Sequence, residues 1–334
     1  MDEARKDPAT FGDSKSKSDD LATSARLEKV GPGTYLIDSR FLGLDKLAAV
    51  YYLDAERPTI IETSGSLCAQ RILEILEGAG IDALAYIIVS HIHLDHAGGV
   101  GDFYERFPDA QVVVHPRGAR HLADPERLHR SVESVYGKEA VQRRWGYMRP
   151  VDACSILPAE DLEKLDLGGG RHLQILHTPG HAKHHMAILD ESTDGVFLGD
   201  SAGVYLSDAD FLAPSTPPPD LDPHAACASL DRVLQCRPKV AYFSHFGPAL
   251  DPARTLEAAK NFYQEWLGIA ESMYDSGKTL DDLAGVLRER EKVRRRHLDD
   301  DASKRLEELV PIEVQAEGYW NYLISRDSNN VGQS

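Results

Sequence analysis

The sequence has few cysteines and no long apolar run. None of its four cysteines, Cys68, Cys154, Cys227 and Cys236, forms a Cys-x-x-Cys pair, so a disulfide scaffold is excluded and buried free thiols are expected. No apolar stretch approaches the roughly 20 residues of a membrane-spanning helix. The polar N-terminus also lacks the apolar centre of a signal peptide. We therefore expect a cytoplasmic protein without a membrane partner.

Positive charge is also in short supply. The chain of 334 residues has 37 lysines and arginines against 54 acidic residues, a net charge of −17. A nucleic-acid-binding protein needs basic groups to displace counterions from phosphates, so this balance argues against nucleic acid and against an anionic membrane surface. The expected partner is a small-molecule substrate, and a homodimer is left open as the assembly.

Composition and periodicity divide the chain into four parts. Residues 1–27 are polar and predict a disordered tail. Residues 28–250 alternate short apolar, strand-like runs with helical patterns, and residues 251–326 predict a helical C-terminal lobe whose first helices are capped by Asp251 and Thr279. Residues 327–334 are assigned to a second tail. A charged segment at 124–148 predicts helix inserted between strands.

Polar side chains follow four of the apolar runs at the point where each run ends. "AYIIVS" leads into "HIHLDH", "HLQILH" leads into "HTPGH", "GVFLGD" ends in an aspartate, and "KVAYFSHFG" contains a late histidine. In α/β sheets, ligand sites gather at the carboxyl ends of strands. The candidate ligands are His91, His93, Asp95, His96, His181, Asp200 and His245.

These seven side chains exceed what one metal ion uses, because a catalytic zinc takes three protein ligands and a water. His91 and His93 alternate along an extended backbone, so they are expected to share one site with His181. Asp95 and His96 then belong to a second site with His245, and Asp200 has two oxygens with which to bridge both. The sequence therefore predicts two divalent metal ions. Zinc is favoured, with iron or manganese as alternatives, because imidazole and carboxylate suit all three.

The same motifs resemble those of the metallo-β-lactamase superfamily. Its HxHxDH signature stands here as "HIHLDH", and "HTPGH", "LGD" and "SHFG" follow in the family's order over about residues 28–250. The resemblance implies an α+β fold, an αββα sandwich with its site at one edge, here with the helical C-terminal lobe attached. It also implies the same ligand assignment, with Asp200 bridging.

The resemblance leaves the reaction open. Asp200 and the lack of a motif cysteine argue against true β-lactamases, and the 44 residues between Asp200 and His245 leave no room for an inserted nuclease domain. What remains resembles the glyoxalase II-like hydrolases and uncharacterised metallohydrolases of this fold. The first hypothesis is a dinuclear hydrolase in which a bridging hydroxide, oriented by the catalytic Asp95, attacks a small ester, thioester or lactone. The alternative is a diiron oxygen-handling or persulfide dioxygenase-like redox protein.

Further residues are assigned supporting roles beside these ligands. His184 and His185 follow His181 closely and are read as a substrate donor or as supports for the ligands. Tyr205 is a candidate donor to an oxyanion, with a packed core tyrosine as the other interpretation. His115 is expected to lie behind the ligands, and Glu62 to orient a metal-binding imidazole.

One expectation concerns the helix that begins at Asp251, only six residues after His245. It carries an apolar patch made of Phe262, Tyr263, Trp266 and Leu267. The patch is expected either to pack the lobe onto the sandwich or to wall a substrate pocket beside the metals.

Overall fold

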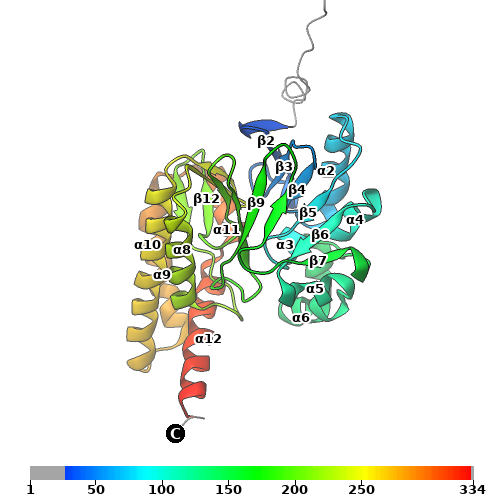
Figure 1. Ribbon diagram of the computed structural model, residues 1–334. Helices are drawn as coiled ribbons and strands as arrows, with labels where there is room; N and C mark the ends of the chain where they lie inside the picture. The colour runs from blue at the N-terminus through cyan, green and yellow to red at the C-terminus, as the bar shows by residue number, and fades with distance from the viewer. Residues whose placement is uncertain (1–26, 332–334) are drawn as a thin grey trace, which may run out of the picture.

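Two β-sheets packed face to face form the centre of the structure, a computed structural model that describes residues 27–331 (Figure 1). Helices cover the outer face of each sheet, so the expected α+β fold with an αββα sandwich and a helical C-terminal lobe is confirmed. The tail predicted at residues 1–27 lies outside the described residues, apart from Leu27, which is buried. None of the helices in the described part of the chain is long and apolar enough to cross a membrane.

The first sheet has seven strands in chain order, antiparallel from β1 to β4 and parallel from β4 to β7. Its strands are β1 (Glu28–Gly31), β2 (Thr34–Asp38), β3 (Ala49–Leu53), β4 (Thr59–Ile61), β5 (Tyr86–Ile88), β6 (Gln111–Val114) and β7 (Ile156–Pro158). The run that leads into the histidine motif is therefore β5, an inner strand of this sheet. Its carboxyl end delivers the motif to the edge of the sandwich.

The second sheet has the order β15-β14-β11-β10-β9-β8, and a separate hairpin pairs β12 with β13. Its strands are β8 (Lys164–Asp166), β9 (His172–His177), β10 (Met186–Asp190), β11 (Gly195–Phe197), β14 (Val240–Phe243) and β15 (Gly247–Ala249). The hairpin strands are β12 (Val204–Leu206) and β13 (Phe211–Ala213). Since β11 and β14 are parallel neighbours, Asp200 and His245, which follow them, emerge at the same end.

Aromatic packing between the two sheets fixes how they meet. Tyr51 of β3 and Phe197 of β11 lie edge to face with ring centroids 5.2 Å apart, and Tyr242 of β14 stacks on Phe197 at 4.7 Å. The Tyr51 hydroxyl also donates a 2.6 Å hydrogen bond to the Phe243 carbonyl. The hydroxyl of a buried tyrosine usually finds such a partner. This bond ties the end of β14, just before His245, to the other sheet.

Six helices lie on the side of the first sheet. They are α2 (Ser66–Gly78), α3 (Leu94–Ala97), α4 (Val100–Arg106), α5 (Pro116–Ala123), α6 (Glu126–Tyr136) and α7 (Lys138–Arg144). Three single 3₁₀ turns complete the described helical segments: η1 (Phe41–Gly43), η2 (Ala153–Ser155) and η3 (Arg295–His297). The segment expected to be helical at 124–148 contains α6 and α7, placed between β6 and β7.

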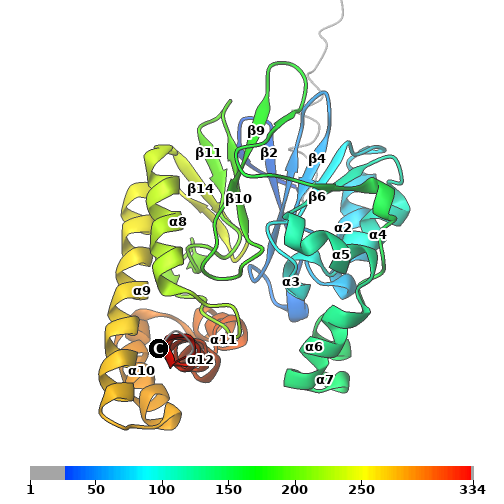
Figure 2. The ribbon, with the colours of Figure 1, turned by 60° about the horizontal axis from the view of Figure 1, so that its bottom comes forward.

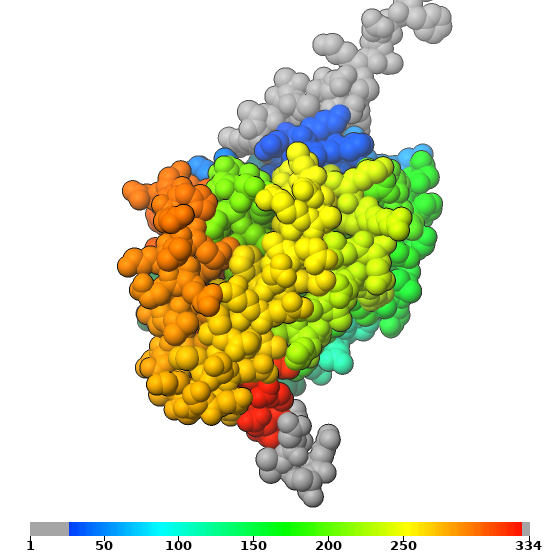
Figure 3. Space-filling view, turned by 90° about the vertical axis from the view of Figure 1, so that its left-hand side faces the viewer, coloured from blue at the N-terminus to red at the C-terminus, as the bar shows by residue number. Residues whose placement is uncertain are grey.

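The remaining helices lie on the side of the second sheet. They are α8 (Pro223–Gln235), α9 (Pro252–Asp275), α10 (Leu280–Arg294), α11 (Asp300–Leu309) and α12 (Ile312–Val331). The side chains of Asp251 and Thr279 accept hydrogen bonds from the first turns of α9 and α10, as expected of N-caps. Figure 3 shows α9 and α10 covering the outer face of the lobe. Helix α12 continues to Val331, past the boundary expected at residue 326.

The apolar patch on α9 belongs to the interior of this lobe. Tyr263, Trp266 and Leu267 are buried among residues of α8, α10 and α12, and the Tyr319 ring of α12 lies 6.2 Å from that of Trp266. Of the two interpretations of this patch, packing is the one that the structure supports. The expectation that part of it walls the substrate pocket is wrong, because α12 lies between α9 and that side of the molecule (Figure 2).

Candidate metal centre

The candidate ligands converge from four loops at one edge of the sandwich. His91 and His93 lie between β5 and α3, Asp95 and His96 lie on α3, and three separate loops after β9, β11 and β14 provide His181, Asp200 and His245. Gly199 allows the loop that carries Asp200 to lie close to Ser90 and His185. It has a φ of +51°, and a Cβ on it would lie 2.6 Å from His185 Nε2 and 2.5 Å from Ser90 Oγ.

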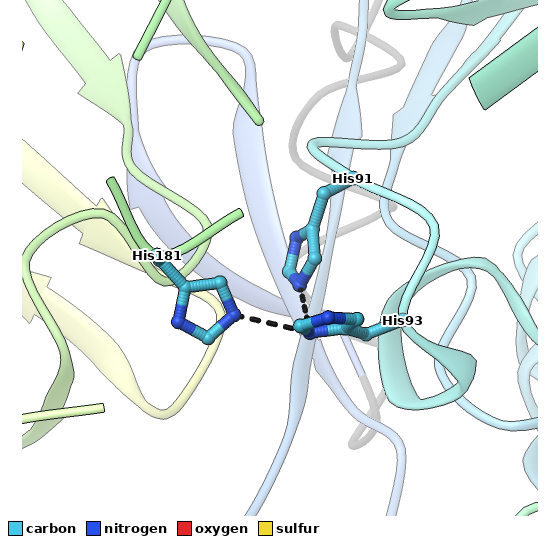
Figure 4. Close-up of side chains that lie close together, drawn as sticks. All are labelled: His91, His93 and His181. Atoms are coloured by element: carbon cyan, nitrogen blue, oxygen red, sulfur yellow. Dashed lines mark hydrogen bonds between the residues drawn. The ribbon is translucent and has the colours of Figure 1, made fainter. Parts of the chain in front are cut away.

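Three imidazoles form the first cluster (Figure 4). His91 Nε2 lies 2.9 Å from His93 Nδ1, and His181 Nε2 lies 3.0 Å from the same His93 atom. His91 is fully buried, and His181 nearly so. Three ring nitrogens that face one point inside the protein provide a ligand set of the kind that a catalytic zinc uses.

The second cluster consists of Asp95, His96 and His245. His245 Nε2 lies 3.2 Å from His96 Nε2 and 3.5 Å from Asp95 Oδ2. The two imidazoles are buried, whereas the carboxylate of Asp95 is 26% exposed. Each cluster thus has one partly exposed member, His93 in the first and Asp95 in the second.

Asp200 lies between the two clusters and directs one oxygen to each. Its Oδ2 is 3.6 Å from His181 Nε2, and its Oδ1 is 3.3 Å from His96 Nε2. Oδ1 is buried without a hydrogen-bond partner in the described part of the chain. A buried charged oxygen without a partner is unstable unless a cation lies beside it. The donor set and this orphaned oxygen both fit divalent metal ions at this position.

Hydrogen bonds behind the clusters fix the orientation of the imidazoles. His181 Nδ1 donates to the Ser215 carbonyl at 3.0 Å, and His245 Nδ1 donates to the Leu47 carbonyl at 2.8 Å. His91 Nδ1 pairs with the Ser90 hydroxyl at 2.9 Å. A proton held on Nδ1 leaves the Nε2 lone pair free for a metal, as in other histidine sites. Ser90, Ser215 and Leu47 were not predicted, because backbone carbonyls and serines give no motif.

Glu62 occupies the position expected of an orienting carboxylate. Its Oε1 lies 3.2 Å from His96 Nδ1 and accepts a 3.0 Å hydrogen bond from the Ser244 hydroxyl. Glu62 has a φ of +68°, in the left-handed region that a residue with a side chain seldom adopts. Backbone strain of this kind occurs at functional sites, where surrounding contacts hold it in place.

The pKa values of the histidines differ between the two clusters. Burial and the neighbouring imidazoles lower the pKa values of His91 and His93, which are therefore neutral and offer free lone pairs. Burial also lowers the pKa of His181, and this effect outweighs the Asp200 carboxylate. The pKa of His96 changes in the opposite direction. Burial lowers it, but the carboxylates of Asp200 and Glu62 outweigh burial and raise it above its usual value.

Both carboxylates of the centre are ionised. Burial favours the neutral acid, but a hydrogen bond from His245 and the charge of His96 outweigh it and lower the pKa of Asp95. The charges of His96, His245 and His181 likewise lower the pKa of Asp200 well below its usual range. The centre therefore presents two anionic ligands among imidazoles, which favours divalent cations.

Two of the remaining predicted residues lie beside the centre. His184 lines the cavity described below, with its ring centroid 5.7 Å from that of His93, and burial lowers its pKa to about 4. His185 is fully buried beneath the ligands, where its Nε2 accepts a 3.1 Å hydrogen bond from the Asp200 amide. His185 therefore supports the Asp200 loop, whereas His184 faces the substrate side.

The structure does not bring the other two predicted residues to the centre. Tyr205 directs its hydroxyl to Asp210 Oδ1 at 2.8 Å and does not line the cavity, which corrects its interpretation as an oxyanion donor. His115 caps α5 by accepting from the Arg117 amide at 3.1 Å, and its ring lies 4.2 Å from that of His177. This pair lines a smaller hollow that shares Pro116, Arg117 and Lys183 with the cavity over the centre.

A cavity of about 1270 Å³ opens over the metal centre. His93, Asp95, His181, Asp200 and His245 form its floor. One wall consists of α5, α6 and α7, and the other consists of the Pro217–Pro219 loop, the end of α11 and α12 (Figure 2). Arg144 of α7 joins the walls through a 2.8 Å ion pair to Glu308 of α11. Neither wall could be predicted from the sequence.

Comparisons with known proteins find relatives in sequence and in fold. The sequence model of the "Metallo-beta-lactamase superfamily" matches residues 47–245. The metallo-beta-lactamase fold-containing protein ST1585 of Sulfurisphaera tokodaii is 31% identical over 218 residues, which are 64% of this chain and 78% of that protein. Its crystal structure superposes with a TM-score of 0.59 at 29% identity, covering 69% of this chain and 85% of that one.

Two further relatives extend the comparison. The metallo-beta-lactamase family protein TTHA1429 of Thermus thermophilus has a TM-score of 0.62 at 23% identity and covers 89% of this chain and 94% of its own, so the likeness in fold extends beyond the sandwich into the helical lobe. The N-acyl homoserine lactonase of Bacillus thuringiensis is 28% identical over 185 residues, 52% of this chain and 62% of that protein.

Proposed function

Because the chain belongs to the metallo-β-lactamase superfamily, whose sequence model matches residues 47–245, we propose that this metallohydrolase uses a dinuclear centre to cleave a small ester, thioester or lactone. The observation that carries the proposal is the placement of Asp200, which directs one oxygen to each of two ligand clusters on the floor of a large cavity. The similarity to a lactonase supports a carbonyl ester as the class of substrate.

His91, His93 and His181 would hold one cation, Asp95, His96 and His245 the other, and Asp200 would be shared between them. When bound, two such cations supply a water of lowered pKa and polarise the substrate carbonyl. Zinc is the favoured metal, because its ordinary ligands are imidazole nitrogens and carboxylate oxygens. Iron and manganese accept the same ligands.

Asp95 is the proposed catalytic residue of the chain. It is the partly exposed carboxylate of the centre and lines the cavity floor, where it contacts both His245 and the space that a substrate would occupy. Because His96 and His245 keep it ionised, it accepts a hydrogen bond from the attacking water and orients the lone pair toward the carbonyl carbon.

His184 is the proposed donor to the carbonyl oxygen. Its Nδ1 accepts a long, 3.5 Å hydrogen bond from the Ile92 amide, so the proton of the neutral ring resides on Nε2. With a pKa of about 4, the ring remains neutral at pH 7 and donates without carrying a charge. A donor placed where negative charge develops lowers the barrier of acyl transfer.

Hydrolysis of a matched ester, thioester and lactone by protein purified without chelator tests the proposal. We expect turnover that a chelator abolishes and that added metal restores. Asp95→Asn should lower kcat/KM by at least about a hundredfold, the usual loss when a positioned acid–base group is removed. The matched control is Asp109→Asn, which makes the same change at an exposed aspartate that does not line the cavity.

Two results would contradict this proposal. Equal losses in Asp95→Asn and Asp109→Asn would show that the floor carboxylate has no special role. Metal-loaded protein that hydrolyses none of the three classes, contains iron and consumes oxygen would favour the redox alternative instead.

A further inference from the structure

Charges of opposite sign are sorted on α5, α6 and the short turn between them. Three arginines, Arg117, Arg120 and Arg127, line the cavity over the metal centre. None of the three acidic residues of the same segment, Asp124, Glu126 and Glu133, lines it. In a chain with a net charge of −17, a cavity wall whose charged groups are all cationic is not what composition alone predicts.

These three arginines also lack ion-pair partners. The other two cations of the cavity are neutralised, since Arg144 pairs with Glu308 and Lys183 pairs with Asp220 at 2.9 Å. Within residues 27–331, no carboxylate lies within 4.0 Å of Arg117, Arg120 or Arg127. Arg120 Nε donates a 3.2 Å hydrogen bond to His121 Nε2, which leaves its two terminal nitrogens. The remaining guanidinium donors of the three arginines can bind an anion from the cavity, and arginine suits phosphate and carboxylate equally.

The electrostatic effect of this wall is visible at His121, which lies among the same residues. Burial lowers its pKa, and the charges of Arg120 and Arg127 lower it further. The charges of the two arginines, seven positions apart, thus both reach this side chain and outweigh the opposing charge of Asp124. The hydrogen bond from Arg120 Nε to His121 Nε2 places that guanidinium directly beside the imidazole.

Helix α6 adds an apolar surface next to the arginines. Leu128, Val132, Val135 and Tyr136 recur at helical spacing and line the cavity. Val135 is 66% exposed and Tyr136 is 44% exposed, so this end of the helix is not covered by the rest of the chain. An apolar face that opens into a substrate cavity fits a hydrocarbon part of the ligand.

The opposite wall has the other sign of charge. Glu307 of α11 and Glu317 of α12 line the cavity, and neither forms an ion pair in the described part of the chain. These carboxylates disfavour an anion on their side and so direct it toward the α5–α6 wall.

We propose that the substrate is an anionic amphiphile: an ester, thioester or lactone with a hydrocarbon chain against α6 and a phosphate or carboxylate bound by Arg117, Arg120 and Arg127. This inference rests on the proposed hydrolase function and names the substrate class of the same site. The anion belongs either to the acyl part, as a carboxylate, or to the leaving group, as a phosphate. Both use the same arginines.

Two matched substrate pairs test the proposal and distinguish the two sources of the anion. S-octanoyl phosphopantetheine and S-octanoyl pantetheine differ only by a phosphate on the leaving group. The mono-para-nitrophenyl ester of suberic acid and para-nitrophenyl octanoate differ by a carboxylate at the end of the acyl chain. We expect kcat/KM at least about tenfold higher for the anionic member of one pair, the size of one charge-assisted hydrogen bond.

Variants that each remove one positive charge test which arginines bind the anionic group of the substrate. Arg120→Gln and Arg127→Gln should each lower kcat/KM about tenfold for the favoured anionic substrate and leave its neutral partner unchanged. Arg130→Gln is the matched control, because Arg130 lies on the same helix, pairs with Glu126 at 3.3 Å and does not line the cavity. Neutral and anionic substrates turned over equally, or equal losses in the control, would overturn the inference while leaving the hydrolase function intact.

Binding measured by calorimetry keeps the inference testable if no substrate is hydrolysed. Octanoate should then bind more tightly than octanamide, and Arg120→Gln and Arg127→Gln should remove the difference, whereas Arg130→Gln should not. Equal binding of the two compounds would contradict the anion site itself. A preference retained in the wall variants would place the anion elsewhere.

Discussion

Asp200 is the single residue on which a two-metal centre depends most. Its two oxygens lie 3.6 Å from His181 Nε2 and 3.3 Å from His96 Nε2, so its carboxylate reaches a ligand of each cluster. Its backbone amide is held by His185 and its Oδ2 by the Ser215 hydroxyl at 3.2 Å. These contacts orient the carboxylate before any metal binds.

Asp200→Asn should therefore retain the fold but hold one of the metals far more weakly. The amide has nearly the shape of the carboxylate, yet it removes the negative charge that two cations would share. Elemental analysis and circular dichroism of the purified variant measure both effects, and activity should fall by orders of magnitude. A variant that retains both metals and full activity would show that Asp200 does not bridge.

The seven candidate ligands could be predicted at this scale because each follows the end of an apolar strand, a pattern that sequence displays directly. Glu62 could be predicted for the same reason, at the end of β4. Tyr205 could not be placed, because β12 was not recognised and a side chain's direction on an unrecognised strand is undetermined. The Leu47 and Ser215 carbonyls could not be predicted, since any residue offers a carbonyl.

At the scale of elements, α12 reaches the metal ligands through the proline-rich loop. Gln315 of α12 is buried, and its Oε1 accepts hydrogen bonds from the amide and hydroxyl of Thr216. The neighbouring Ser215 contacts both His181 and Asp200. Gly318 permits this contact, because a Cβ there would lie 1.8 Å from the Thr216 carbonyl oxygen. Gln315 is therefore a positioning residue for two ligands.

Gln315→Leu should lower metal affinity by about tenfold or more, the usual effect of losing an outer hydrogen bond to a metal ligand. Competition with a chromogenic chelator measures the affinity, and the melting temperature of the metal-free protein measures stability separately. The matched control, Glu313→Gln, changes an exposed residue of the same helix that pairs with Arg288. A lower melting temperature with unchanged metal affinity would mean that Gln315 only packs the lobe.

Strands and helices were predicted unequally well. The long helices could be predicted from repeated turns, and strands β2 to β6 from the apolar runs in which they lie. Strands β7, β8, β12, β13 and β15 are no shorter than β4 and β5, but charged residues, proline or glycine lie within or directly beside them, so no apolar run marks them. Helix α5 was not predicted either, because its eight residues include a proline, a glycine, two arginines and a histidine.

At the scale of the whole molecule, the cavity combines segments far apart in the sequence. Arg144 and Glu308 meet across it at 2.8 Å, although 164 positions separate them. No local pattern specifies such a contact, which is why α9 rather than α11 and α12 was expected beside the metals. The helical lobe itself could be predicted, but which of its helices faces the sandwich depends on how the lobe folds back.

The whole molecule thus places a metal centre, an arginine wall and an apolar helix face around one cavity. The central claim within this arrangement is that the centre holds two metal ions. Both the shared Asp200 and the proposed attack on a carbonyl follow from it.

Elemental analysis of protein purified without chelator tests this claim most directly. We predict close to two divalent metal ions per chain, with zinc as the favoured element. Replacing His245, a ligand of the second cluster only, by alanine should lower the metal content to about one ion per chain. A reproducible content near one in the unaltered protein would contradict the dinuclear centre.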